Sequence, residues 1–178
     1  RIIKQMKDAD RDFLANQKLE EASKLSYEWN FADAIKPCSE ALKLKPNWYL
    51  AYQKRGVLYS HLKQYNQAIE DFNKAIQFNP NFAEVYLNRG VTYAELGDIL
   101  KKQDNLLKFR EMYNLAIKDF SKCIELDPKN KMGYYNRAFA YKKLGYDEKS
   151  KLDLIKARKL EQWIKSSWLI DILSGIDS

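Results

Sequence analysis

Hydrophobic and small residues recur along the chain at the spacing of amphipathic helices, with polar residues between them. Residues 49–82 show this pattern twice, first around Gly56 and then around Ala68 and Phe72. Pro80 follows the second run of helical spacing and would end it. The pattern therefore predicts a hairpin of two helices over these residues.

The same pattern returns at a regular distance along the chain. Gly56 has an earlier counterpart at Ala22 and a later one at Gly90, each about 34 residues away. Ala138 is the next counterpart, after a longer step. A fixed period of this length is the signature of an array in which each repeat is one small structural unit. We therefore predict four hairpin repeats, which span residues 15–48, 49–82, 83–130 and 131–162.

The third repeat is longer than the others, because its second half keeps register only after 14 extra residues at about 98–112. Fourteen residues are two heptads, so each helix of this hairpin can gain seven residues without rotating its buried face. The extra length is either a neutral insertion or a projecting arm that adds a contact surface. The basic residues of this arm are Lys101, Lys102, Lys108 and Arg110.

The two ends of the chain differ from the repeats. Residues 1–14 keep a loose helical spacing and predict an N-terminal helical extension. The first helix of the first repeat is expected to end near Trp29. Residues 163–178 contain two tryptophans before Gly175 and predict a separate C-terminal helix that caps the exposed end of the core.

Composition supports a folded, all-α protein. The 178 residues are 46% hydrophobic and include only 6 Gly and 4 Pro, and the alternation typical of strands is missing. No apolar run is long enough to span a membrane, and no signal peptide is evident. A chain that opens at Arg1 without Met can be a piece of a longer protein.

The net charge of +7 is uneven, since residues 98–178 carry 17 Lys or Arg against 12 Asp or Glu. This excess favours acidic partners. The lysines stand singly or in pairs, without a dense basic run, so nucleic acid is the less favoured partner. A reduced, cytoplasmic setting is expected from the cysteine usage.

Candidate chemistry is sparse. Cys38 and Cys123 fall on the repeated apolar positions of second helices, so both are expected to be small buried side chains. With one histidine, His61, the chain lacks the spacing of a metal site. We find no pairing of nucleophile and base and no phosphate-binding loop, so no catalytic residue, cofactor or metal is predicted, and we expect no enzymatic activity.

The repeat period, the glycines at Gly56 and Gly90, the aromatic residues at Tyr59 and Tyr93 and the closing prolines resemble the tetratricopeptide repeat (TPR) family. The resemblance covers about residues 16–162. It implies a right-handed α-solenoid superhelix of antiparallel helix hairpins. It also implies a concave groove, lined by the first helices, that holds a segment of a partner protein.

The groove residues are then the first-helix positions left after the packing face is assigned. The first repeat contributes Asn16, Leu19, Glu20, Ser23 and Tyr27. The other repeats contribute Gln53, Lys54, Val57, His61, Leu87, Asn88, Val91, Glu95, Tyr135, Asn136, Phe139 and Lys143. Asn88 and Asn136 are expected to hold a partner's backbone amides above an apolar floor.

Some members of the family clamp the C-terminal carboxylate of heat-shock chaperones with two lysines, two asparagines and an arginine. Here Gln53 and Met132 stand at the two lysine positions, Val57 at one asparagine position and Asn136 at the arginine position. Only Asn88, at the other asparagine position, matches. A carboxylate would lack its cations, so this clamp is disfavoured.

The sequence therefore predicts a non-catalytic adaptor that binds a peptide or protein segment in its groove. One alternative is that the chain is the interaction domain of a larger enzyme or assembly. Another is that the basic second half binds RNA or an acidic surface, which a steep loss of affinity with salt would reveal. Self-association through the arm or the apolar tail is also open.

Overall fold

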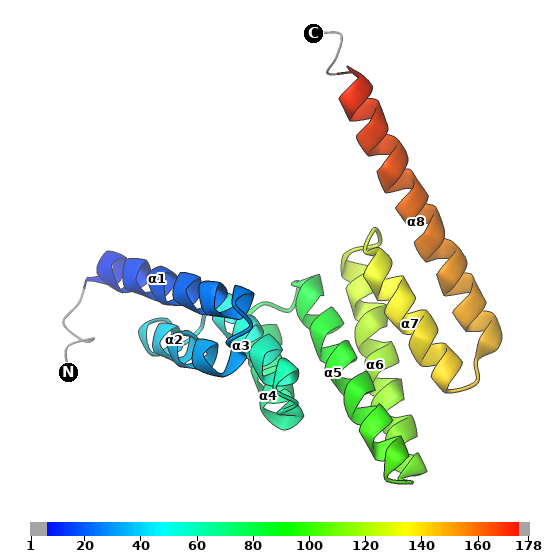
Figure 1. Ribbon diagram of the computed structural model, residues 1–178, viewed down its shortest axis with the longest axis horizontal. Coiled ribbons are helices and arrows are strands. Elements are labelled where there is room, and N and C mark those ends of the chain that lie inside the picture. The colour runs from blue at the N-terminus through cyan, green and yellow to red at the C-terminus, as the bar shows by residue number, and fades with distance from the viewer. Residues whose placement is uncertain (1–6, 175–178) are drawn as a thin grey trace. The chain divides into compact units, whose positions relative to one another are not determined.

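The computed structural model describes the backbone of residues 7–174 and the side chains of residues 7–162. Within those residues every regular element is an α-helix, which confirms the predicted all-α class (Figure 1). The chain forms two compact units, Arg1–Thr92 and Tyr93–Ser178. Each unit is built from antiparallel helix hairpins.

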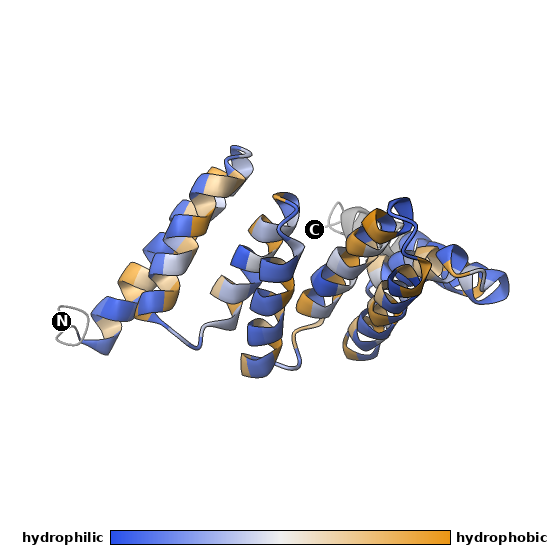
Figure 2. Ribbon diagram, turned by 90° about the horizontal axis from the view of Figure 1, so that it is seen from below, coloured by the Kyte–Doolittle hydropathy of each residue, from blue (hydrophilic) through white to orange (hydrophobic). Residues whose placement is uncertain are grey.

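Unit 1 contains two complete hairpins and the beginning of a third. Its helices are α1 (Asp8–Tyr27), α2 (Phe31–Leu44), α3 (Tyr49–His61), α4 (Tyr65–Phe78) and the first half of α5 (Ala83–Lys102). Helix α1 packs on α2 and α3 packs on α4, while α2 also packs on α3. Figure 2 shows that the helices carry both hydrophobic and hydrophilic stretches, as amphipathic helices do.

Small residues bring the helices of unit 1 close together. Ala22 of α1, Ala34 and Cys38 of α2, and Leu58 of α3 form one buried cluster. Gly56 of α3 lies so close to α4 that a Cβ atom there would meet the ring of Phe72 at 2.7 Å. The ring thus fills the space that the missing side chain leaves, which explains the repeated small residue at this position.

Unit 2 contains the rest of α5 together with α6 (Leu106–Leu126), α7 (Lys131–Lys143) and α8 (Asp147–Ser174). Helices α5 and α6 have 20 and 21 residues, whereas α3 and α4 have 13 and 14. A Cβ atom at Gly97 of α5 would meet the ring of Tyr113 at 2.9 Å, so the longer hairpin is also closely packed. Whether residues 98–112 are an insertion stays a prediction.

Each hairpin turns through one residue in the left-handed backbone region. Gly145 has a φ of 84°, and the corresponding positions in the other hairpins are occupied by Trp29, Lys63 and Asp104 at 62°, 59° and 57°. The residue after each of them donates its amide to a carbonyl five positions back, which closes the end of the first helix. The first helix of the first repeat therefore ends at Tyr27, earlier than the predicted end near Trp29.

Helix α8 does not stop where the other second helices stop. Helices α2, α4 and α6 end at Leu44, Phe78 and Leu126, which are equivalent repeat positions, and a proline follows each two residues later. The equivalent end in α8 is Leu160, but Gln162 replaces the proline and the helix continues to Ser174. Residues 163–174 thus continue α8 without a break. That the C-terminal segment caps the core stays a prediction. Residues 175–178 lie outside the described part.

The outward face of α1 carries mostly polar side chains around Phe13, which is 67% exposed. Gln17, Glu21 and Lys24 are exposed, although the same repeat positions in α3 are Ala51, Arg55 and Leu58, two of which are fully buried against α2. Of the predicted N-terminal extension, residues 8–14 are the beginning of α1, and residues 1–6 are not described.

Candidate peptide-binding groove

A half-buried arginine, Arg55, joins the first helix α3 to the second helices on both sides of it. Arg55 donates from Nε and Nη2 to the two carboxylate oxygens of Asp71 on α4, at 2.7 and 2.8 Å. Its Nη1 donates to the hydroxyl of Ser39 on α2 at 3.0 Å. The Asp71 carboxylate raises the pKa of Arg55, while burial raises the pKa of Asp71 against the effect of the arginine.

The same arrangement recurs in unit 2. Arg137 of α7 donates to both carboxylate oxygens of Asp153 on α8, at 2.7 and 2.8 Å, and to Ser121 on α6 at 3.0 Å. Because a guanidinium group is planar and rigid, three bonds of this kind fix the rotation of the first helix about its own axis. They determine which side chains of α3 and α7 remain for a partner.

Two of the predicted groove residues of α3 are engaged between helices. Gln53 donates from Nε2 to Oε1 of Glu84 on α5 at 3.2 Å. Val57 packs, partly buried, against the core cluster that contains Phe72 and Val85. Gln53 joins α3 to α5 and Val57 belongs to the packed core, so both shape the floor of the face rather than extend from it.

His61 lies at the end of α3 and stacks on the ring of Phe31 from α2. The ring centroids are 4.5 Å apart and the planes are within 6° of parallel. The imidazole is nevertheless exposed to solvent. This predicted groove residue therefore belongs to the turn end of the hairpins.

Residues at one repeat position are held in place but lack side-chain partners. Lys54, Asn88 and Asn136 are equivalent in α3, α5 and α7, and all three are half-buried. Within the residues that the structure describes, neither asparagine amide makes a hydrogen bond and Lys54 makes no ion pair. Half-buried amides that are unpaired can both donate to and accept from a peptide backbone.

The first helix α1 has fewer side chains available to a partner. Leu19 packs into the core clusters of unit 1, and Asn16 and Ser23 bond to carbonyls of their own helix, at 2.9 and 2.8 Å. Tyr27 is 88% exposed at the end of the helix, and Glu20 is exposed. In α5, Leu87 and Val91 are half-buried and Glu95 is exposed.

The groove residues of α7 combine aromatic and charged groups. The hydroxyl of Tyr135 donates to Oε2 of Glu161 on α8 at 3.2 Å, and the ring of Phe139 is 52% exposed. Lys143 lies 4.9 Å above that ring and donates to Oδ1 of Asp98 at 2.8 Å. Phe139 is thus an exposed aromatic surface beside a cation that is already paired.

The arm residues are all exposed. Lys101 and Lys102 end α5, and Lys108 and Arg110 lie in the first turns of α6. Lys101 lies 5.1 Å from the centre of the Phe109 ring. The turn between the helices is closed by Asn105, whose side chain accepts from the Lys108 amide at 3.2 Å.

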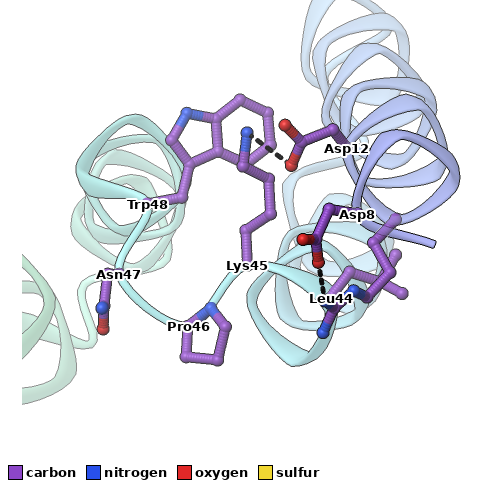
Figure 3. Close-up of a pocket in the computed structure, with 8 residues that line it drawn as sticks. Asp8, Asp12, Leu44, Lys45, Pro46, Asn47 and Trp48 are labelled. Carbon is purple, nitrogen blue, oxygen red and sulfur yellow. Dashed lines mark hydrogen bonds and ion pairs between the residues drawn. The ribbon is translucent and has the colours of Figure 1, made fainter. Parts of the chain in front are cut away.

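A hollow of about 470 Å³ lies where the α2–α3 loop meets the start of α1 (Figure 3). Lys45 reaches from the loop to Asp12 at 3.1 Å and lies 4.8 Å from the centre of the Trp48 ring. Asp8 pairs with Arg11 at the same place. These charges are already paired with one another, so the hollow has no clear preference for a ligand.

The arginine pairs were not recognised from the sequence as a recurring interaction. Their signal was present, because Arg55 and Asp71 are 16 residues apart and so are Arg137 and Asp153. Each arginine also follows its serine partner, Ser39 or Ser121, by the same interval. Comparison of polar positions between repeats, alongside the apolar ones, would have found them.

No helix in the described part of the chain has the length and hydropathy of a membrane span. The described residues also contain no group of three or more His, Cys, Asp or Glu that could hold a metal ion. Both cysteines are buried and unpaired with one another, as expected.

The arrangement defines a class of proteins, namely helical repeats built from interlocked hairpins. A model described as TPR repeat matches residues 58–97, and two described as tetratricopeptide repeat match residues 105–130 and 120–157. The chain belongs to the tetratricopeptide repeat family. No curated protein matches the sequence.

Solved structures agree on the fold. A crystal structure of MamA is 20% identical, covers 92% of this chain and 87% of its own, and gives a TM-score of 0.75. The TPR domain of OM64 from Arabidopsis is 21% identical over 74% of this chain and 98% of its own, with a TM-score of 0.65. The first TPR of Spaghetti (RPAP3), bound to the HSP90 peptide SRMEEVD, is 19% identical over 75% and 95%, with a TM-score of 0.64.

Proposed function

We propose that this chain is a non-catalytic protein-interaction module whose first helices bind an extended segment of a partner protein. The observation that carries the proposal is that equivalent first-helix positions hold half-buried polar side chains without partners in the described part of the chain, Lys54 and Asn88 in unit 1 and Asn136 in unit 2. An asparagine amide without a protein partner can exchange its contacts with water for hydrogen bonds to a peptide backbone. The TPR fold supports the same function.

The segment would be internal to the partner and not its C-terminal carboxylate. A TPR of RPAP3 binds an HSP90 peptide, but here Gln53 is already bonded to Glu84 and Val57 packs against the core. The three clamp positions that need a cation hold Gln53, Met132 and Asn136, so a terminal carboxylate would lack a counter-charge. Lys54 favours a segment with an acidic residue, because this ammonium group has no counter-charge among the described residues.

The test starts from a peptide selected on the purified chain from a random library displayed on phage. We expect Asn88→Ala with Asn136→Ala to weaken binding of that peptide about 30-fold, which corresponds to about 2 kcal/mol for the lost backbone hydrogen bonds. Titration by fluorescence anisotropy measures the effect. Circular dichroism should show unchanged helix content.

The matched control changes asparagines on the second helices. Asn66 and Asn114 are exposed and occupy one repeat position in α4 and α6. Alanine at both should leave the affinity unchanged. Equal affinities for the two double variants would contradict the assignment of the first-helix face. The exposed arm of α5 and α6 is proposed as an additional contact, and Lys102→Glu with Lys108→Glu should then weaken acidic peptides.

A further inference from the structure

The last hairpin carries an uncovered face. A hollow of about 550 Å³ lies between α7 and α8, lined by Tyr135, Phe139 and Lys142 of α7 and by Asp147, Ser150, Lys151 and Leu154 of α8. The apolar side chains among them are Tyr135, Phe139 and Leu154. Phe139 is 52% exposed there, and Ile155 of α8 is 51% exposed.

In the second repeat the equivalent face is covered by the next first helix. Phe72, the counterpart of Leu154, is fully buried and packs with Val85 of α5. Gln53, the counterpart of Tyr135, bonds to Glu84 of α5 at 3.2 Å. Ser60, the counterpart of Lys142, lies 3.1 Å from the hydroxyl of Thr92 on α5. The hollow on α7 and α8 thus has the position of a missing first helix.

Residues 165–174 continue the register of the first helices. Ser167 occupies the repeat position that holds the small or apolar residues Ala51, Val85 and Gly133 in the earlier first helices. Trp168 occupies the position of the aromatic residues Tyr52, Tyr86 and Tyr134. Ser174 occupies the position of Leu58, Thr92 and Ala140, which are buried. The segment therefore has the sequence pattern of a helix that would cover such a face.

Charge supports the same occupant. The arginine position of the first helices becomes Asp171, and the residue it would face, equivalent to Ser39 and Ser121, is Ile155. One turn to either side of Ile155 stand Lys151 and Arg158, where earlier second helices have isoleucine or leucine. Lys151 is paired with Glu148 at 2.7 Å, so Arg158 is the positive charge on the covered face that a negative charge on the covering segment would accompany.

The segment cannot reach the face of its own chain while α8 is one helix. It lies along the same axis as the α8 residues that line the hollow, and Ser174 is about 21 Å beyond Leu160 at 1.5 Å per residue. We infer that residues 165–174 of one copy cover the α7–α8 face of a second copy, and that the second copy returns the same contact. The result is a symmetric dimer that exchanges its terminal helices.

The first experiment uses sedimentation velocity and one position, Gln162. The full chain should be a dimer, and so should Gln162→Ala, which keeps α8 continuous. Gln162→Pro restores the proline that follows α2, α4 and α6, so α8 should end near Leu160 and the segment should fold onto its own face, giving a monomer. A monomeric full chain at all concentrations would overturn the inference, as would a dimer of Gln162→Pro with unchanged affinity.

The second experiment identifies the contact. Lys142 and Ser174 are equivalent to Ser60 and Thr92, whose hydroxyls are 3.1 Å apart, so cysteines at both positions should be close enough to bond. Purified Lys142→Cys and Ser174→Cys chains are unfolded together, refolded and oxidised. A covalent pair containing one of each is expected. An intrachain disulfide in the double variant, with no covalent pair from the mixture, would show that each segment covers its own face and would overturn the exchange.

Discussion

Arg55 and Asp71 meet through two parallel hydrogen bonds of 2.7 and 2.8 Å, with their side chains 20% and 6% exposed. Removing the arginine would leave a buried carboxylate without a counter-charge. We predict that Arg55→Ala lowers the free energy of unfolding by about 3 kcal/mol, measured by urea denaturation. The exposed Arg110→Ala should change it by less than about 0.5 kcal/mol. The pair would be less important than its geometry suggests if Arg55→Ala cost no more than this control.

Gly56 is predicted to tolerate no side chain. An added methyl group would lie 2.7 Å from Cε1 of Phe72, closer than nonbonded carbons approach. Gly56→Ala should therefore lower the free energy of unfolding by about 2 kcal/mol, the usual cost of overpacking a core. Thermal denaturation provides the measurement. Adding Phe72→Leu should recover part of the loss, and a double variant that shows only the summed losses would place the cause elsewhere.

At Lys63, in contrast, a substitution is predicted to raise the free energy of unfolding. Its φ of 59° is costly for a residue with a side chain, and glycine already occupies the equivalent turn position at Gly145. Lys63→Gly should raise the free energy of unfolding by about 1 kcal/mol. Gly145→Ala, at a φ of 84°, should lower it by a similar amount. Calorimetric melting should show that Lys63→Gly stabilises the chain and that Gly145→Ala destabilises it.

The buried cysteines predict a loss of stability at high pH. Burial raises the pKa of Cys38 from 9.0 to about 12 and that of Cys123 from 9.0 to about 11. Between pH 9 and these values the unfolded thiols ionise while the native thiols stay protonated, so stability is complete below pH 9 and falls as the pH rises.

Urea denaturation at about pH 8 and about pH 10.5 should show this loss, and Cys38→Ala should reduce it by about 1 to 2 kcal/mol. The difference between the variant and the unaltered chain cancels the titration of other groups. Thiol-specific reagents should also react with the native chain only as fast as it opens. Rapid labelling of Cys38 without denaturant would disagree with its burial.

The extra length of α5 and α6 predicts that the hairpin can be shortened in register. Deleting residues 96–102 and 106–112 removes seven residues from each helix and retains the turn at 103–105. We expect a folded chain whose helical circular dichroism falls in proportion to the residues lost. A deletion of residues 96–101 and 106–111 removes six from each helix, rotates the buried faces and should fold poorly. Equal stability of the two deletions would exclude the heptad account.

Much of the fold was predictable because apolar spacing and breakers act locally. The starts of α3, α4, α5 and α7 follow from the repeat, and Pro80 and its counterparts mark where second helices end. The continuity of α8 past Leu160 was not predicted, although Gln162 stands where the other repeats have a helix-ending proline. A pattern of apolar residues shows which face is buried but not whether the backbone breaks between two runs.

The candidate site was less predictable. Assigning groove residues by elimination treats every position outside the packing face as available, yet Gln53 and Val57 are taken by α5. Only the contacts between helices that are neighbours in space distinguish Gln53 and Val57, which are engaged, from Asn88 and Asn136, which are not. Such contacts join residues about 31 positions apart, so no local rule reveals them.

The outward face of α1 limits what it can contact. Gln17, Glu21 and Lys24 surround Phe13, which is 67% exposed, so this face offers one isolated aromatic side chain. The corresponding face of α3 instead buries Ala51 and Leu58 against α2. A helix from another copy would bury little apolar surface on α1, so α1 is a poor place for the array of hairpins to be extended.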